Sequence, residues 1–79
     1  MSNLDKYNSI FCETFQVTVE KLDENFSSSN IDTWDSVLQL SLVTQMEDSF
    51  DVMLEPEDIM DFKSYSIGKE ILTKYGVEF

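Results

Sequence analysis

Apolar residues recur every third or fourth position at the start of the chain, which predicts an amphipathic helix over residues 3–17. The members of this stripe are Leu4, Tyr7, Phe11 and Phe15. Cys12 flanks the stripe, and nothing basic lies near it to lower the pKa of its thiol. We therefore expect Cys12 to be a small core or boundary residue.

The helical pattern is lost from residue 18 to residue 33. Serines and an asparagine at positions 27–30 compete for backbone hydrogen bonds and favour a loop. The apolar residues of this stretch are irregularly spaced, and they are Val19, Leu22, Phe26 and Ile31. We expect them to anchor a long, ordered loop, with room for one short helical turn, on the rest of the domain.

A second helix is predicted over residues 36–50, because Asp35 and Ser36 are good N-cap residues and no Gly or Pro interrupts the segment. Its core face should consist of Leu42, Val43, Met46 and Phe50. The first turns are also apolar, and their members are Val37, Leu38 and Leu40. One helix face cannot bury all of these side chains, so some must be exposed and suggest a docking surface.

Two further helices complete the pattern. Pro56 suits the first position of a short helix that reaches about Phe62. Ser64 or Ser66 then caps a last helix that ends before Gly76. The expected apolar face of this helix is Ile67, Ile71, Leu72 and Tyr75. The fold class is thus all-α: a four-helix bundle in a single domain, residues 1–79, with a long loop after the first helix and a short third helix.

Charge is unevenly distributed along the chain. The 79 residues carry 16 acidic and 5 basic side chains, for a net charge of −11. No basic residue lies between Lys21 and Lys63, so the acidic excess falls in the middle of the chain. Such a field repels nucleic acid and anionic membranes and attracts basic protein surfaces. We expect a monomer, and because the N-terminus has no signal-peptide pattern and no apolar run is long enough for a membrane span, a cytoplasmic one.

The residue inventory argues against an enzyme. There is no histidine, Cys12 is the only cysteine, and no glycine-rich phosphate loop is present. The commonest general base, the commonest metal ligand and any Ser-His or Cys-His nucleophile pair are therefore missing from the sequence. A calcium-binding loop is the alternative suggested by the dense acids, but the run from Asp48 to Asp51 lacks the alternating ligands, central glycine and closing glutamate that it needs.

The junction between the long loop and the second helix reads Trp34-Asp35-Ser36-Val37. Here the chain resembles the acyl carrier protein family, whose attachment site is Asp-Ser-Leu at the start of the second helix. The resemblance continues through residues 47–51 and through the turn of residues 56–59. It spans about residues 11–75, is clearest over residues 34–62, and implies a four-helix bundle of acyl-carrier type.

The resemblance implies a carrier without a catalytic site of its own. Ser36 would receive a 4'-phosphopantetheine arm from coenzyme A, and Asp35 would help a phosphopantetheinyl transferase to place its metal-bound substrate. The arm would hold acyl or aminoacyl thioesters and deliver them to biosynthetic enzymes. Acyl-activating and acyl-transfer enzymes with basic docking surfaces are the implied partners, and the positions that match the family's recognition residues are Val37, Leu40, Glu47 and Asp48.

The departures from the family pattern carry further expectations. Trp34 stands where a small residue is usual, and the Trp-Asp-Ser form resembles stand-alone carriers of specialised pathways. Val37 replaces the usual leucine, which argues against the standard fatty-acid partners. We expect Trp34 to pack on the core rather than to cover the arm. Large apolar residues near the third helix either line an acyl space or fill the core, and filling is favoured because their bulk leaves little void; they are Met46, Phe50, Leu54, Ile59 and Phe62.

A second interpretation assigns no chemistry to Ser36. The chain would then be an acidic helical adaptor with a carrier-like fold that is never phosphopantetheinylated. Such a module explains the size, the charge and the exposed apolar residues, but it makes the Asp35-Ser36 pair a coincidence. Modification of Ser36 separates the two interpretations.

Overall fold

The computed structural model describes residues 2–79, which form four α-helices and one 3-10 turn. The helices are α1 (Asn3–Phe15), α2 (Ser36–Phe50), α3 (Pro56–Asp61) and α4 (Tyr65–Lys74), and the turn is η1 (Val19–Lys21). Within these residues no strand forms, although one antiparallel bridge pairs Ser27 with Ser64. The all-α prediction, the long connection after the first helix and the short third helix are confirmed.

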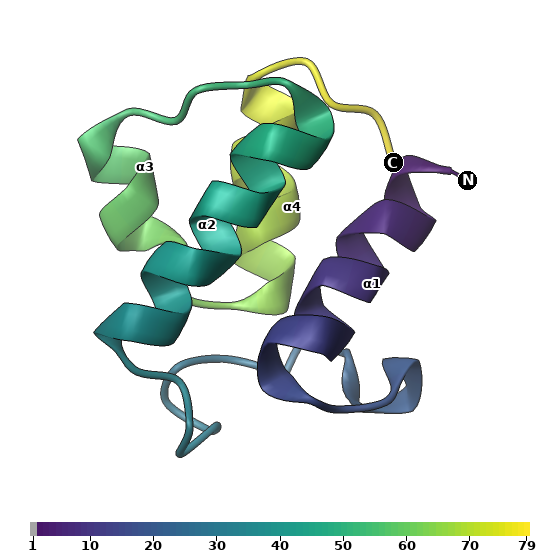
Figure 1. The fold of residues 1–79 in the computed structure, drawn as a ribbon, viewed down its shortest axis with the longest axis vertical. Coiled ribbons are helices and arrows are strands. Elements are labelled where there is room, and N and C mark those ends of the chain that lie inside the picture. The colour runs from purple at the N-terminus through teal and green to yellow at the C-terminus, as the bar shows by residue number, and fades with distance from the viewer. Residues whose placement is uncertain (1) are drawn as a thin grey trace.

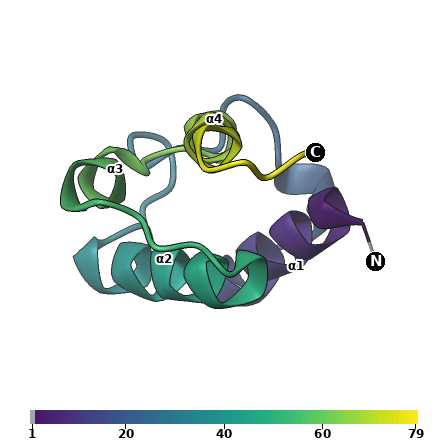
Figure 2. The same cartoon turned by 90° about the horizontal axis from the view of Figure 1, so that it is seen from above.

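The helices lie in two layers (Figures 1 and 2). α1 and α2 lie side by side in one layer, and α3 and α4 form the other. The long connection from residue 16 to residue 35 crosses one end of the molecule before it enters α2. The two termini meet at the opposite end, where the Asn3 side chain donates a hydrogen bond to the Glu78 carbonyl at 2.9 Å.

The helix ends follow local backbone chemistry. α2 spans the predicted residues, whereas α1 stops two residues before the predicted end. Gln16 adopts a left-handed conformation with φ of 55°, and the Val17 N–H bonds back to the Cys12 carbonyl at 3.1 Å. This arrangement closes the helix and turns the chain into the long connection.

Aromatic rings fill the centre between the layers. Phe11 is fully buried, and its ring centroid lies between 5.0 and 6.4 Å from those of six other rings. These neighbours are Tyr7, Phe15, Phe26, Trp34, Phe62 and Tyr65. They come from α1, from α4, from the long connection before α2 and from the short connection between α3 and α4, so Phe11 joins these four segments in one core.

Gly68 allows α4 to approach this core closely. A Cβ atom at position 68 would overlap the Tyr7 hydroxyl and lie 2.5 Å from the Phe62 ring. The Tyr7 hydroxyl donates to the Tyr65 carbonyl at 2.5 Å, and burial raises the pKa of this phenol above its usual range. α1 and α4 therefore fit together through shape as well as through a buried hydrogen bond.

One of the four expected anchors of the long connection is more exposed than predicted. Phe26 is buried, and Leu22 and Ile31 pack against the core, but Val19 is 55% exposed because all of η1 faces solvent. The prediction that Val19 anchors the loop is wrong.

Two residues of the predicted helix stripes are also partly exposed. Ile67 faces outward because α4 turns Gly68 and Leu72, rather than Ile67, towards the core. Leu4 lies in the first turn of α1, beyond the edge of the aromatic core. The stripes thus predicted the buried side of each helix correctly but extended it one residue too far.

Candidate functional site

Ser36 is the first residue of α2 and is exposed where the long connection ends (Figure 1). Asp35 caps the helix: its Oδ1 accepts a hydrogen bond from the Leu38 N–H at 2.8 Å, and its carbonyl accepts one from the Gln39 N–H at 2.9 Å. Of the two candidate caps, only Asp35 fills that position. The Ser36 hydroxyl is not needed for the cap, while the helix start holds its backbone in place.

Trp34 ties the start of α2 to the core. Its indole is buried, and its ring centroid lies 4.8 Å from that of Phe15 and 6.0 Å from that of Phe26. The indole N–H also donates to the Gln39 side-chain oxygen at 3.4 Å. The expectation that Trp34 packs on the core is confirmed, and this packing fixes the chain two residues before Ser36.

A shallow groove runs beside Ser36 between α2 and α3. It has a volume of about 350 Å³ and is lined by Ser36, Gln39, Leu40, Ile59, Met60 and Lys63. The first three share one face of α2, since they are spaced by three and four residues. Ile59 and Met60 belong to α3, and Lys63 follows it directly. The groove therefore combines an apolar wall with one ammonium group.

Gln39 joins the two walls of this groove. Its Nε2 donates to the Ile59 carbonyl at 2.9 Å and reaches the Met60 carbonyl at 3.4 Å. Both carbonyls lie at the C-terminal end of α3, where the Ile59 carbonyl also accepts a long hydrogen bond from the Phe62 N–H at 3.4 Å. Sequence reasoning missed Gln39, Met60 and Lys63, and the one available signal was the spacing of Gln39 three residues after Ser36.

The four expected partner-recognition residues differ in exposure. Val37 and Leu40 are 75% and 59% exposed, and Asp48 also lies at the surface. Glu47 is half-buried, and its Oε2 accepts a hydrogen bond from the Leu54 N–H at 2.9 Å. Val37, Leu40 and Asp48 thus face solvent, whereas Glu47 helps to hold the connection between α2 and α3.

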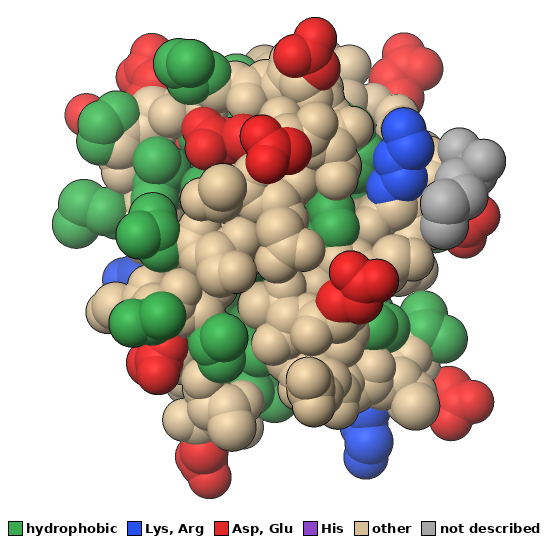
Figure 3. All heavy atoms as spheres, viewed as in Figure 1, with side chains coloured by type: hydrophobic (Ala, Val, Ile, Leu, Met, Phe, Trp, Pro, Cys, Tyr) green, Lys and Arg blue, Asp and Glu red, His purple; other side chains and the backbone are tan. Residues whose placement is uncertain are grey.

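Exposed apolar side chains gather over α3 and the first half of α2, on the left side of Figure 3. The exposed apolar residues of these two helices include Val37, Leu40 and Met60, which is 68% exposed, and Leu40 and Met60 line the groove beside Ser36. Acidic side chains are spread over the same face, and basic ones are few. The predicted exposed apolar surface beside Ser36 is therefore present.

A buried carboxylate holds α3 to the end of α4. Asp58 forms an ion pair with the Lys74 ammonium at 2.6 Å and accepts a hydrogen bond from the Tyr75 hydroxyl. The Tyr75 oxygen in turn accepts the Glu55 N–H at 3.0 Å. The hydrogen bonds from Lys74 and Tyr75 lower the pKa of Asp58 below its usual range. The Asp58 carboxylate therefore serves to hold α3 against the C-terminal end of α4.

Cys12 lies half-buried on the outer side of α1, in a hollow shared with Ser9 and Val19. Burial and the neighbouring Glu13 carboxylate raise the pKa of its thiol. The thiolate is therefore scarce at neutral pH. The expected boundary position of Cys12 is confirmed.

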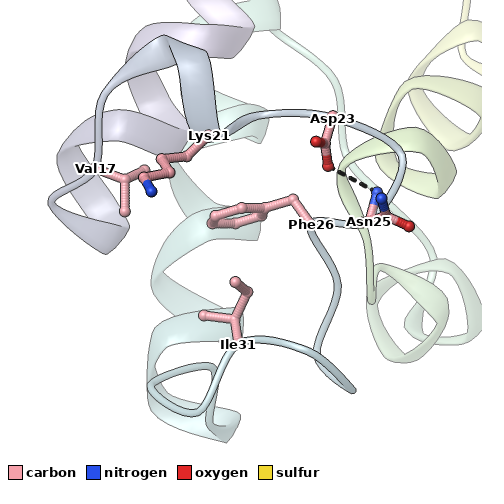
Figure 4. A pocket seen from close by; sticks show the side chains of 6 residues that line it. All are labelled: Val17, Lys21, Asp23, Asn25, Phe26 and Ile31. Carbon is pink, nitrogen blue, oxygen red and sulfur yellow. Dashed lines mark hydrogen bonds between the residues drawn. The ribbon is translucent and has the colours of Figure 1, made fainter.

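A second hollow, of about 240 Å³, lies within the long connection (Figure 4). It is lined by Val17, Lys21, Asp23, Asn25, Phe26 and Ile31. Phe26 and Ile31 point into it, and the Asn25 N–H donates to the Asp23 carboxylate at 2.8 Å. Its apolar residues are anchors of the connection, so this hollow belongs to the packing of the loop.

The residues expected to fill the space near the third helix do belong to the core. Met46, Leu54 and Phe62 are buried, and Phe50 and Ile59 pack against them at the edge of the cluster. Ile59 also contributes to the groove wall. These side chains agree with the interpretation that favoured a filled core.

Neither protein-family models nor curated proteins match this chain. Across residues 2–79, no helix is both long and apolar enough to cross a membrane. The same residues contain no group of three or more cysteine, aspartate or glutamate side chains placed to hold a metal ion. The function is therefore argued from the geometry around Ser36.

Proposed function

We propose that this chain is an acyl carrier protein whose phosphopantetheine arm is attached to Ser36. The observation that carries the proposal is the exposed Ser36 hydroxyl at the first position of α2, next to an aspartate that already caps the helix. A modifying enzyme can reach this oxygen without disturbing the cap. The resemblance of residues 34–62 to the carrier family supports the same assignment.

The surroundings of Ser36 fit a phosphodiester. The N–H groups of the first helical residues, Ser36 and Val37, have no acceptor inside the helix, and the helix start carries a partial positive charge. On modification, the Ser36 oxygen bonds to the phosphorus of the pantetheine phosphate. The adenosine bisphosphate part of coenzyme A leaves, and the transferase accepts the hydroxyl proton. Once attached, the arm supplies a thiol that carries the acyl or aminoacyl group.

The surface around the site suits transient partners. Val37, Leu40 and Met60 offer apolar contact beside the arm. Asp48 and the acidic excess of the mid-chain region attract enzymes with basic docking surfaces, which speeds encounter and orients the carrier. Chemistry would be performed by those enzymes, since the carrier contributes no general base.

Modification of Ser36 is the direct test. The purified apo protein is incubated with coenzyme A, Mg²⁺ and a broad-range phosphopantetheinyl transferase, and its intact mass is measured. We expect a mass gain of one phosphopantetheinyl group. Ser36→Ala should show no gain, and the matched variant Ser66→Ala, which removes an exposed serine from the first turn of α4, should be modified like the wild type.

The variant Asp35→Asn tests the role of the neighbouring carboxylate separately. Asparagine caps helices well, so the helix content measured by circular dichroism should stay the same. Loss of the carboxylate should slow modification if Asp35 assists the transferase. A folded wild-type chain that gains no mass, or a Ser36→Ala variant that gains it equally, would contradict the proposal and favour the adaptor interpretation.

A further inference from the structure

Lys63 is held at the end of the groove that begins at Ser36. Its N–H donates to the Asp61 carbonyl at 2.8 Å, and its carbonyl accepts the Ser28 N–H at 2.8 Å. The adjacent bridge between Ser27 and Ser64 fixes the same turn to the long connection. The Lys63 side chain therefore extends from a backbone that is tied on both sides, and it lines the groove together with Ser36.

The Lys63 ammonium is the one basic group of an acidic region. No other basic residue occurs between Lys21 and Lys69. The described residues contain a single ion pair, between Lys74 and Asp58. Within this part of the chain, Lys63 therefore has no carboxylate partner. An unpaired cation that lines a groove together with the attachment serine, where none of the described acids contributes to the lining, is complementary to a single anionic group at that serine.

We propose that Lys63 pairs with the phosphodiester of the arm on Ser36 and directs the arm into the groove between α2 and α3. This inference rests on the proposed function, because it requires a modified Ser36. The phosphodiester is bonded to the Ser36 oxygen and so lies at the mouth of the groove. An ammonium of the groove attracts it inward and away from open solvent.

The walls of the groove suit the remainder of the arm. Leu40, Ile59 and Met60 give an apolar surface for the gem-dimethyl part of pantetheine, and the long Met60 side chain adapts its shape easily. Gln39 holds these walls together through its hydrogen bonds to the end of α3. The arm thus docks reversibly on the carrier surface, and partner enzymes compete for it.

Nuclear magnetic resonance of the holo protein tests this docking. The arm is added enzymatically, its presence is verified by intact mass, and the methionine methyl groups are labelled with ¹³C. We expect cross-relaxation between the Met60 methyl and the gem-dimethyl protons of the arm, and a change in the Met60 methyl shift between apo and holo protein. Met53, which is 84% exposed in the turn after α2, is the internal reference that should not change.

Variants at Lys63 assign the effect to its charge. Lys63→Gln should lower the ratio of docked to free arm roughly two- to fivefold, the range of an exposed ion pair, and Lys63→Arg should retain it. Lys21→Gln removes an equal charge from the hollow in the long connection and should leave docking unchanged. Raising the salt to about 1 M should weaken docking in the wild type more than in Lys63→Gln.

The outcomes separate the two proposals. A chain that gains the arm by mass but shows no Met60 contact, or shows the same contact in Lys63→Gln as in Lys21→Gln, overturns the docking inference and leaves the carrier function standing. A chain that never gains the arm overturns both. Contact that is lost in Lys63→Gln and kept in Lys63→Arg supports the inference.

Discussion

α4 and α3 are held to the same α1–α2 layer by different forces. α4 packs through buried aromatic rings and through the close approach at Gly68. α3 has six residues and is held by polar contacts. Gln39 of α2 donates to the end of α3, and Asp58 of α3 pairs with Lys74 of α4. Glu47 of α2 accepts a hydrogen bond from the connection that leads into α3. We therefore expect the aromatic core to contribute most of the stability of the fold, and the hydrogen bonds, together with the packing of Ile59 on the core, to fix the position of α3.

This difference matters for the site because α3 forms one wall of the groove beside Ser36. A helix of six residues has little stability of its own in water. Its position therefore depends on contacts with α2 and α4, and loss of one polar tie should change the groove without unfolding the core. Mutations in the two regions should consequently have distinct signatures.

Phe11→Ala should have the largest effect. Phe11 is fully buried at the centre of the aromatic cluster, and its removal leaves a cavity. We expect the free energy of unfolding to fall by about 3–5 kcal/mol, which removes much or all of the stability of a domain this small. Urea unfolding followed by circular dichroism measures it.

Phe79→Ala is the matched control for that change. The Phe79 ring packs at the edge of Tyr7 but is 43% exposed. We expect a smaller loss of about 1–1.5 kcal/mol, since nearly half of this side chain stays in contact with water. Equal losses in the two variants would contradict the central role of Phe11.

Gln39→Ala should act locally on α3. It removes the donor to the Ile59 and Met60 carbonyls and the acceptor of the Trp34 indole. We expect global stability to fall by about 1 kcal/mol, the net value of a partly exposed hydrogen bond and its stranded partners. Hydrogen exchange of the α3 amides should accelerate more than that of the α4 amides.

Gln45→Ala separates this effect from a general loss of glutamine in α2. The Gln45 amide donates to the Thr14 hydroxyl at 3.0 Å and to the Ser41 hydroxyl at 3.4 Å, and both acceptors lie outside α3. Its removal should leave α3 exchange unchanged. If exchange in α3 and α4 rose equally in Gln39→Ala, the idea that α3 is positioned by separate polar ties would be wrong.

Asp58 should have the smallest effect on stability, and this effect depends on pH. The pKa of Asp58 is lower in the fold than its value of 3.8 in an unfolded chain, so its ion pair with Lys74 and bond from Tyr75 stabilise the fold above that pH. Protonation removes this contribution as the pH falls through the folded pKa. The hydrogen bonds to Asp58 raise the pKa values of Lys74 and Tyr75. The stabilisation that comes from their protonated forms is therefore lost only in strongly alkaline solution.

Asp58→Asn isolates this contribution from the other carboxylates. The difference in unfolding free energy between wild type and Asp58→Asn should be largest near neutral pH and should shrink as the pH approaches about 3. Urea unfolding of both proteins at each pH supplies the measurement. A difference that stays constant over this range would show that the Asp58 charge does not hold α3.

The helices could be predicted from sequence because their signals are local. The unbroken segment after Asp35 fixed the bounds of α2, and Pro56 and Ser64 marked the starts of α3 and α4. The exposure of Val37 and Leu40 also followed from local pattern, since one face of α2 cannot bury every apolar side chain near its start.

Features that depend on tertiary contact were not predictable in the same way. The groove requires α3 to lie beside the first turn of α2, and no spacing in the sequence relates Lys63 to Ser36. The hydrogen bond that the Leu54 N–H donates to the Glu47 carboxylate depends on how the chain turns after α2, so the sequence pattern assigned Glu47 to the surface. Gly68 was overlooked because its role appears only when Tyr7 and Phe62 pack against it.

The half-buried thiol on α1 has a consequence for a carrier of thioesters. A second nucleophilic sulfur on the same molecule would draw acyl groups off the arm by thiol–thioester exchange, a reaction that needs the thiolate. Burial and Glu13 raise the pKa of the Cys12 thiol, and Cys12 lies in a different hollow from Ser36. On the proposed function, this thiol would therefore compete little for an acyl group held on the arm. The sulfur of the proposed arm would then be the more reactive of the two thiols on the molecule.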